Sequence, residues 1–247
     1  MISSMNLIVD IGNSRAKAVV MSDGMVVAES VATEPTRGWL QNIIAGHRVE
    51  RAIVASTRGN GHDIALMLRD MLPYVVEFVP ATTPIPIANH YHSTATLGAD
   101  RLAAAVGAVA LYPESDIMIV DFGTAITIDY VVAGSYLGGN ISPGVTTRFR
   151  ALADYTASLP LCDATDDVLD YGRTTREAIE QGVMRGVEHE IRGYVELFLE
   201  EKTKKIVIFT GGDAKYFVKR IKNTIFADCE PVVYGLSRIL EYNAERC

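Results

Sequence analysis

A carboxylate, a glycine and several hydrogen-bond donors stand directly after an apolar run, in the order Asp10-Ile11-Gly12-Asn13-Ser14-Arg15-Ala16-Lys17. A carboxylate at the end of a buried strand has a fixed position and can hold a hydrated Mg²⁺. A glycine lets the backbone approach a phosphate closely, and the polar groups after it can donate hydrogen bonds to phosphate oxygens. The segment therefore predicts a phosphate-binding turn. The alternative is a strand that simply ends in an Asp-Gly turn.

A second stretch of the same kind, Asp121-Phe122-Gly123-Thr124, lies near the middle of the chain. Both copies have an apolar strand, then Asp-x-Gly followed by Asn or Thr, then a hairpin pattern. The repeat favours a duplicated mixed α/β domain with a cleft between the halves, in which the two turns hold a metal-nucleotide from both sides. A protein-kinase interpretation of Asp-Phe-Gly is excluded because the other kinase motifs are missing. A Walker-type loop is also absent from the sequence.

The run Leu97-Gly98-Ala99-Asp100-Arg101 is placed at the start of a predicted helix. In the functional interpretation, Asp100 orients and deprotonates a substrate hydroxyl while Arg101 holds an anionic group. In the alternative, Asp100 caps the helix and forms a salt bridge with Arg101.

Two further glycine-rich junctions are candidates for close approach of a ligand. The run from Gly138 to Gly144 compresses three glycines and a proline between a strand and a helix, although a tight turn explains it nearly as well. The run Thr210-Gly211-Gly212-Asp213-Ala214 follows a strand, where adenine or ribose could lie. A helix-capping turn by Asp213 is the competing explanation.

Composition restricts the class of protein. The 247 residues suit one large domain or two smaller ones, and a net charge of -7 disfavours a nucleic-acid partner. The three cysteines are odd in number and lack CxxC spacing, which disfavours disulfides and a structural zinc site and fits a reducing compartment. Neither a signal peptide nor a membrane-spanning segment is expected, so the cytoplasm is the predicted location.

Hydrophobic periodicity predicts an alternating α/β chain. Strands are expected at 7–9, 16–21, 25–31, 52–55, 75–79, 117–121, 125–132, 135–141 and 206–210. Helices are expected at 39–44, 63–71, 100–111, 146–154, 174–200, 214–221 and 233–242. The segment 80–92 is expected to be irregular.

Taken together, these residues resemble the type III pantothenate kinase family of the acetate kinase/sugar kinase/Hsp70/actin superfamily. Six motifs occur in the family's order and cover nearly the whole chain. They are the DxGN turn at Asp10, the GADR at 98–101, the DFGT at 121–124, the GGxIxPG at 138–144, the TAxLP within 155–160, and the TGGDA at 210–214. The GADR and TAxLP elements separate this family from sugar kinases and chaperones.

The resemblance implies two RNase H-like (actin-like ATPase) domains, at about 1–115 and 116–247, with a nucleotide cleft between them, in a homodimer that phosphorylates pantothenate with ATP. It also implies a role for each motif. Residues 10–17 would bind phosphate, Asp10 near Mg²⁺, and Thr124 would contact ATP. Asp100 would be the catalytic base. Asp121 would ligate a monovalent cation, K⁺ or NH₄⁺. Pantothenate would be bound by Tyr91, Gly98, Ala99, Asp100 and Arg101, and by Thr175 across a dimer interface, although Thr174 lies beside it.

The sequence departs from the family at small points, such as Ser14 where many members have Thr, and none of these removes a functional group. Two rival functions remain open. One is a non-catalytic relative that acts as an accessory regulator, against which the retained Asp10, Asp100, Arg101 and Asp121 argue. The other is a phosphatase or nucleotide hydrolase of the same superfamily, which the GADR and TAxLP pairing disfavours.

Overall fold

The computed structural model describes residues 5–200, 204–226 and 230–246, which divide between two compact units. The first unit comprises Met1–Pro113, Gly134–Leu137 and Cys229–Cys247, and the second comprises Glu114–Ala133 and Gly138–Asp228. The division predicted from sequence, 1–115 and 116–247, differs from these units mainly at the end of the chain. There the last helix packs along a helix of the first unit instead of joining the second.

The sheet of the first unit has the strand order β3-β2-β1-β4-β5. Its strands are β1 (Met5–Ile11), β2 (Ala16–Ser22), β3 (Met25–Ala32), β4 (Val49–Ser56) and β5 (Tyr74–Glu77). The first three form an antiparallel meander, and β4 and β5 run parallel to β1. The β2–β3 hairpin turns through Asp23 and Gly24, which both have positive φ, as its Asp-Gly sequence predicts.

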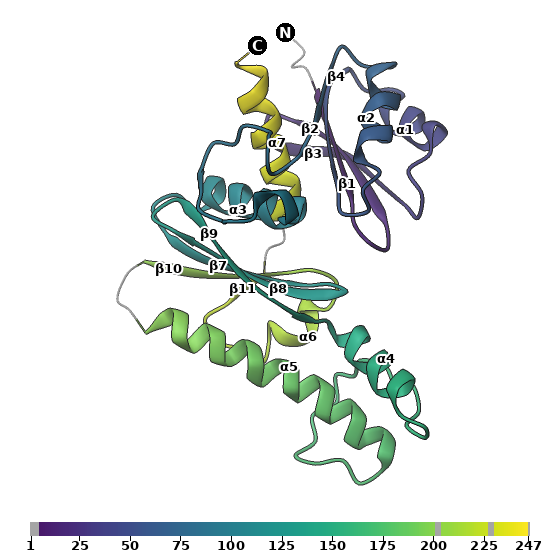
Figure 1. Ribbon diagram of the computed structural model, residues 1–247, viewed down its shortest axis with the longest axis vertical. Helices are drawn as coiled ribbons and strands as arrows, with labels where there is room; N and C mark the ends of the chain where they lie inside the picture. The colour runs from purple at the N-terminus through teal and green to yellow at the C-terminus, as the bar shows by residue number, and fades with distance from the viewer. Residues whose placement is uncertain (1–4, 201–203, 227–229, 247) are drawn as a thin grey trace. The chain divides into compact units, whose positions relative to one another are not determined.

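Helices cover both faces of this sheet, as Figure 1 shows. The helices α1 (Arg37–Ile44) and α2 (Gly61–Arg69) contribute Leu40, Ile64 and Leu68 to a buried cluster with Leu7 and Val9 of β1. On the other face, α7 (Pro231–Ala244) contacts β1 and β4 and packs along α3 (Ala99–Leu111). Because both faces are covered, β1 is apolar almost throughout, which fixes the strand that carries Asp10.

The segment between β5 and α3 contains only the short strand β6 (Ala88–Asn89) and the 3₁₀ turn η1 (Thr94–Thr96), in keeping with the irregular stretch predicted there. β6 pairs in parallel with Ser135 and Tyr136, and the amide of His90 donates to the Tyr136 carbonyl over 2.9 Å. This pairing fixes the residues around Tyr91 within the first unit.

The second unit repeats the strand order of the first. Its strands are β7 (Asp116–Phe122), β8 (Ala125–Val132), most of β9 (Ser135–Pro143), β10 (Lys205–Thr210) and β11 (Ile225–Phe226), in the order β9-β8-β7-β10-β11, and β6 pairs with the beginning of β9 as a sixth strand of the same sheet. β7 and β8 are antiparallel, while β10 runs parallel to both β7 and β11. The shared order supports the duplication predicted from the repeated Asp-x-Gly motif. It also makes the fold class an actin-like α/β architecture with two RNase H-like units.

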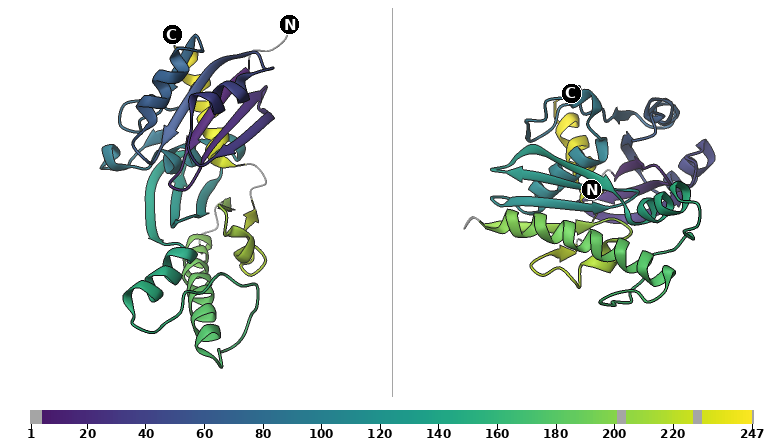
Figure 2. Two further views of the ribbon diagram at one scale, coloured as in Figure 1. Left: turned by 90° about the vertical axis from the view of Figure 1, so that its right-hand side faces the viewer. Right: turned by 60° about the horizontal axis from the view of Figure 1, so that its bottom comes forward.

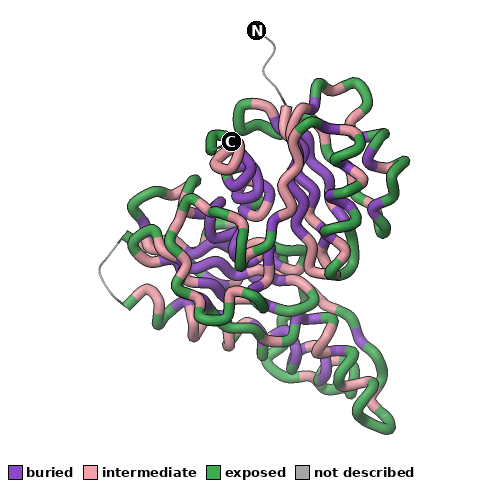
Figure 3. The backbone as a smooth tube through the Cα atoms, turned by 45° about the horizontal axis from the view of Figure 1, so that its top comes forward, coloured by how far each residue is buried: buried purple, intermediate pink, exposed green. Residues whose placement is uncertain are grey.

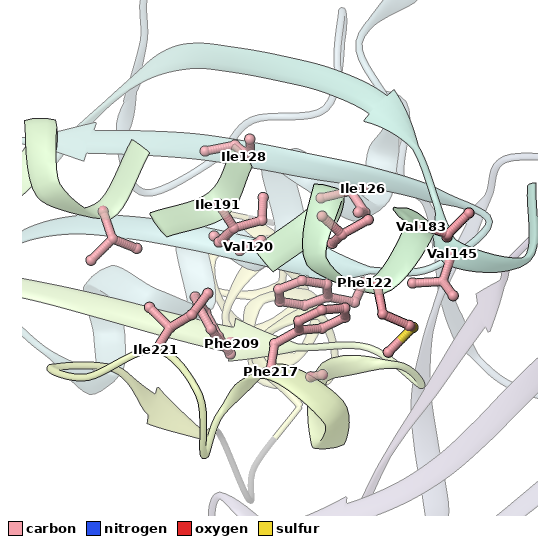
Figure 4. Close-up of a cluster of buried hydrophobic side chains, with 14 of the residues drawn as sticks. Val120, Phe122, Ile126, Ile128, Val145, Val183, Ile191, Phe209, Phe217 and Ile221 are labelled. Carbon is pink, nitrogen blue, oxygen red and sulfur yellow. The ribbon is translucent and has the colours of Figure 1, made fainter. Parts of the chain in front are cut away.

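One face of the second sheet is covered by α5 (Thr175–Leu199), a helix of 25 residues, as the views in Figure 2 show. The apolar side of α5 includes Val183 and Ile191, which meet Val120 and Ile128 of the sheet. Figure 4 shows these side chains together with Phe122 and Phe209 of the sheet and with Phe217. The short helix α6 (Ala214–Phe217) and the helix α4 (Val145–Tyr155) add to the same core.

Buried residues are concentrated in the central strands of each unit and in the helices α3 and α7 (Figure 3). Two short strands, β6 and β11, were not predicted, and α6 ends at Phe217, where a helix to 221 was expected.

Cys162 is buried and forms no disulfide, whereas Cys229 and Cys247 lie outside the described residues. In the part of the chain that the structure describes, no helix combines the length and apolar character needed to cross a bilayer.

Candidate active site

The first carboxylate turn joins β1 to β2. Asp10 lies one residue before the end of β1, opposite Lys17 on β2 and Ala55 on β4. Ile11 and Ala16 pair with each other at the mouth of the turn, and both side chains are fully buried in the core. Any contact that these two residues make with phosphate is therefore restricted to their backbone. Their side chains hold the two strands that present the turn.

Residues 12–15 form a short loop that the amide of Gly12 closes by donating to the Arg15 carbonyl over 3.0 Å. Asn13, Ser14 and Arg15 are all exposed. A Cβ placed on Gly12 would meet only the Arg15 carbonyl oxygen, at an ordinary 3.6 Å. The fold itself therefore does not demand glycine at this position. A ligand that must approach the backbone gives a reason for it.

Lys17 stands apart from the rest of this segment because carboxylates already surround its amine. Its Nζ lies 3.0 Å from Glu29 and 2.9 Å from Glu230. Burial by itself lowers the pKa of Lys17, but the hydrogen bonds and attraction of Glu230 and Glu29 outweigh it, and the net pKa is raised. A phosphate would have to compete with both carboxylates for this amine. The sequence did not reveal that two carboxylates would compete with phosphate for Lys17.

The GADR residues begin α3. Gly98 is the N-cap and makes no side-chain cap bond, so Asp100 occupies the second helical position, not the cap. A carboxylate oxygen of Asp100 accepts a 2.9 Å hydrogen bond from the Arg101 amide, which fixes the side chain at the positive end of the helix. The idea that Asp100 is the helix cap is therefore wrong in its geometry. A Cβ on Gly98 would come within 2.5 Å of the Asp100 oxygen, so the glycine makes room for the carboxylate.

Arg101 is almost completely buried, at 6% exposure, and its guanidinium lies 5.7 Å from the centre of the Tyr91 ring. Tyr91 also contacts Tyr136, with ring centres 6.2 Å apart. The structure thus brings Tyr91 to the GADR segment, as the predicted substrate site requires. A buried guanidinium beside an aromatic ring is a strong binder of carboxylates. Ala99 is buried and contributes packing at the base of this group.

The second carboxylate turn joins β7 to β8. Asp121 lies one residue before the end of β7, opposite Thr127 on β8, and it is the last residue of β7 that pairs with β10, opposite Thr210. The next side chain, Phe122, is anchored in the core by Phe209 and Phe217, at centroid distances of 5.0 and 4.9 Å. This anchor holds the Asp121 backbone in the way that Ile11 holds Asp10 in the first unit.

The run from Gly138 to Gly144 is explained by the chain's own packing. A Cβ on Gly144 would come within 2.7 Å of the Thr124 carbonyl oxygen, and the Gly144 amide donates to the same oxygen over 3.0 Å. Thr147 adds a 2.7 Å hydrogen bond to that carbonyl. The backbone that approaches this glycine is therefore that of the Asp121–Thr124 turn. The hydrogen bonds from Gly144 and Thr147 fix the backbone of Thr124.

The TGGDA residues lie directly beside Asp121. Gly211 has a φ of +92°, and a Cβ there would collide with the Asp121 carboxylate and lie 2.6 Å from the Phe122 amide. Asp213 donates its amide to the Phe122 carbonyl over 3.2 Å but makes no side-chain cap bond to α6. Capping therefore does not account for Asp213. Burial raises the pKa of its carboxyl, and Lys215 opposes the shift only partly.

The structure distinguishes the two neighbouring threonines at the start of α5. Thr174 is the N-cap, and its hydroxyl accepts from the Glu177 amide over 3.2 Å in a complete capping box. Thr175 is the first helical residue and is exposed. Because the hydroxyl of Thr174 is committed to the cap, the geometry favours Thr175 as the residue that contacts a ligand.

The sequence analysis missed the loop after β4. Thr57 and Arg58 bond to the carbonyls of Ile11 and Gly12, which makes them direct supports of the first turn. A signal was present, because the polar run 56–60 directly follows a buried strand parallel to β1. The ends of adjacent parallel strands meet at one edge of a sheet, where binding residues gather.

The family model for type III pantothenate kinase matches residues 6–197, more than half of the sequence. The chain belongs to the type III pantothenate kinase family. A curated type III pantothenate kinase from Phocaeicola vulgatus is 40% identical over 240 residues, covering 97% of this chain and 99% of the relative. The resemblance inferred from six motifs is thereby confirmed.

Solved structures with lower identity agree on the fold. A Campylobacter jejuni protein named as a Baf family transcriptional activator superposes with a TM-score of 0.64 at 20% identity, covering 97% of this chain and 99% of that chain. A Sinorhizobium meliloti protein assigned as a 2-dehydro-3-deoxygalactonokinase gives 0.61 at 14% identity, covering 96% and 99%. At these identities, the likeness shows the shared architecture alone.

Proposed function

We propose that the chain phosphorylates pantothenate with ATP to give 4′-phosphopantothenate, the first step of coenzyme A biosynthesis. The observation that carries the proposal is the membership of this kinase family over nearly the full chain. The geometry of the GADR segment supports it. Asp100 is held at a helix start beside a buried Arg101, so a proton acceptor and an anion binder lie on adjacent residues.

In the proposed reaction, Asp100 accepts the proton of the substrate hydroxyl as that oxygen attacks the γ-phosphorus of ATP. Arg101, with Tyr91 beside its guanidinium, binds the pantothenate carboxylate. Gly98 and Ala99 shape this site, and the exposed Thr175 reaches substrate held by the other subunit of a homodimer. Positioning of the two reactants supplies much of the rate acceleration, as expected for phosphoryl transfer.

The exposed turn at residues 12–15 binds the phosphates of ATP through backbone amides and polar side chains, and Thr124 contacts the nucleotide. Asp10 would hold Mg²⁺, and Asp121 would hold K⁺ or NH₄⁺. In the described residues, no group of three or more His, Cys, Asp or Glu forms a metal cluster. A single carboxylate suits Mg²⁺ on a nucleotide, because the ion takes its other ligands from phosphate and water.

The donor set at Asp121 also fits a hard cation. An Asp121 carboxylate oxygen and the Phe122 carbonyl oxygen both lie close to Gly211, so one backbone oxygen is near the carboxylate. When bound, the two cations supply positive charge that offsets the charge of the transferring phosphoryl group. We place this activity in the cytoplasm.

The test is a product assay on purified protein with Mg²⁺, ATP and K⁺, with and without pantothenate. Mass spectrometry should detect 4′-phosphopantothenate in equal amount to ADP, and only when pantothenate is present. ADP release without pantothenate would instead indicate a nucleotide hydrolase, and no turnover at all would favour a regulator. In a buffer with Na⁺ alone the rate should collapse, and K⁺ or NH₄⁺ should restore it. Equal rates in the three salts would remove Asp121 from the cation site.

A further inference from the structure

Hydrogen bonds within the loop between β4 and α2 fix the backbone of Arg58. The Arg58 amide donates to the Ser56 hydroxyl over 3.1 Å, and that hydroxyl donates to Asn60 over 2.7 Å. Gly59 follows with a φ of +79°, which turns the chain back into the helix. These bonds fix the backbone of Arg58 directly after the strand that neighbours β1.

The Arg58 side chain ties together two separate segments of the first unit. Its Nε donates to the Gly12 carbonyl over 2.6 Å, and its Nη1 donates to the Thr33 carbonyl over 3.0 Å. Glu34 lies 3.4 Å from the same Nη1. The side chain is only 19% exposed, so these charge-assisted bonds are partly shielded from water. The guanidinium is therefore held by backbone oxygens and is not a mobile surface charge.

These contacts determine how the phosphate turn presents its amides. The Ile11 carbonyl accepts from both the amide and the hydroxyl of Thr57, over 2.9 and 3.2 Å. The Gly12 carbonyl accepts from Arg58. A trans peptide is planar, so its N–H points opposite to its C=O. With the Gly12 carbonyl turned toward Arg58, the amide of Asn13 points the other way, and no described backbone carbonyl accepts a hydrogen bond from it.

We propose that Arg58 is a positioning residue for nucleotide binding, which holds the Gly12–Asn13 peptide so that the Asn13 amide is presented to a phosphate oxygen of ATP. The inference rests on the proposed function of residues 12–15 as the phosphate turn. Arg58 itself touches no substrate in this scheme. Without its bond to the Gly12 carbonyl, that peptide can rotate, and the amide must be reoriented before each nucleotide binds.

The experiment compares Arg58→Met and Arg58→Lys with Arg37→Met, a matched control that removes one positive charge from the same unit. Arg37 pairs with the exposed Asp70, the residue directly after α2. We expect Arg58→Met to raise KM for ATP about tenfold or more and to lower kcat, since loss of one preorganised donor costs about 10²–10³ at most. KM for pantothenate should stay unchanged. Arg58→Lys should recover part of the loss, because its single amine can bond one carbonyl.

Thermal melting and ADP titration by calorimetry separate the possible outcomes. A merely structural arginine would lower Tm and disturb both KM values together, which would overturn the inference. An unchanged KM for ATP in Arg58→Met would also overturn it. If Arg58→Met melts far below the control, Arg58→Lys carries the test, because it retains the charge and the aliphatic stem. If the wild-type protein makes no phosphopantothenate, the proposed function fails, but the role of Arg58 can still be tested by ADP binding. Weaker ADP binding by the Arg58 variants than by Arg37→Met would support that role, and equal binding would overturn it.

Discussion

Replacing Asp100 with asparagine separates catalysis from stability at one position. Asparagine keeps the size of the side chain and an oxygen that can accept the 2.9 Å bond from the Arg101 amide. It removes the proton acceptor. If Asp100 is the general base, Asp100→Asn should lower kcat by about 10²–10⁴, the usual contribution of general acid–base catalysis. At about 1.36 kcal/mol per decade, that corresponds to roughly 3–5 kcal/mol of transition-state stabilisation.

The expected cost in folding stability is much smaller. Asp100 lies in the first turn of α3 but is not its cap, so the substitution removes the attraction between a carboxylate and the helix dipole. That attraction contributes about 0.3–1 kcal/mol. For a chain of this size, 1 kcal/mol shifts Tm by about 2–4 °C. The effect on turnover should therefore exceed the effect on stability several-fold.

Asp63 supplies the matched control, because it is also an acidic residue in the first turn of a helix of the first unit, α2. Asp63→Asn should show a similar small drop in Tm with normal turnover. The assay couples ADP release to NADH oxidation at saturating ATP and pantothenate, with melting followed on the same samples. Near-normal kcat in Asp100→Asn would refute the general-base role. A drop in Tm well beyond that of Asp63→Asn would show that the carboxylate serves the fold.

Two other predictions use the described geometry. Thr174→Val should lower stability by about 1 kcal/mol, because its hydroxyl caps the Glu177 amide, and should spare KM for pantothenate, whereas Thr175→Val should raise that KM with little change in Tm. The reverse pattern in paired melting and kinetic measurements would move the substrate contact to Thr174. Burial raises the pKa of Asp213, so the native state retains a proton that the unfolded chain loses, and stability falls as pH rises from the ordinary aspartate value through the native pKa. Asp213→Asn should therefore be more stable than wild type at pH 7, with the difference vanishing near pH 4, and an equal difference at both pH values would contradict this.

The periodicity of the sequence predicted most of the helices and strands, because each of them buries an apolar face in its unit. The turns between them have ordinary turn residues. The repeated strand and Asp-x-Gly turn predicted a duplication, and the two sheets share one strand order. The Asp-Gly hairpin formed where it was expected. The misses were β6, β11 and the end of α6, which are elements of two to four residues. Such elements carry too few residues to show a period of their own.

The motif residues could be identified from the sequence alone, because carboxylates, glycines and a GADR run have fixed identities and order. Their partners were decided only by tertiary structure. The last helix joins the first unit by packing on α3, which brings Glu230 to Lys17. Arg58 reaches the Gly12 carbonyl because β4 lies beside β1, although the two residues are 46 positions apart. Hydrogen bonds of this kind depend on which strands become neighbours, a property of the whole fold that no local pattern of residues encodes.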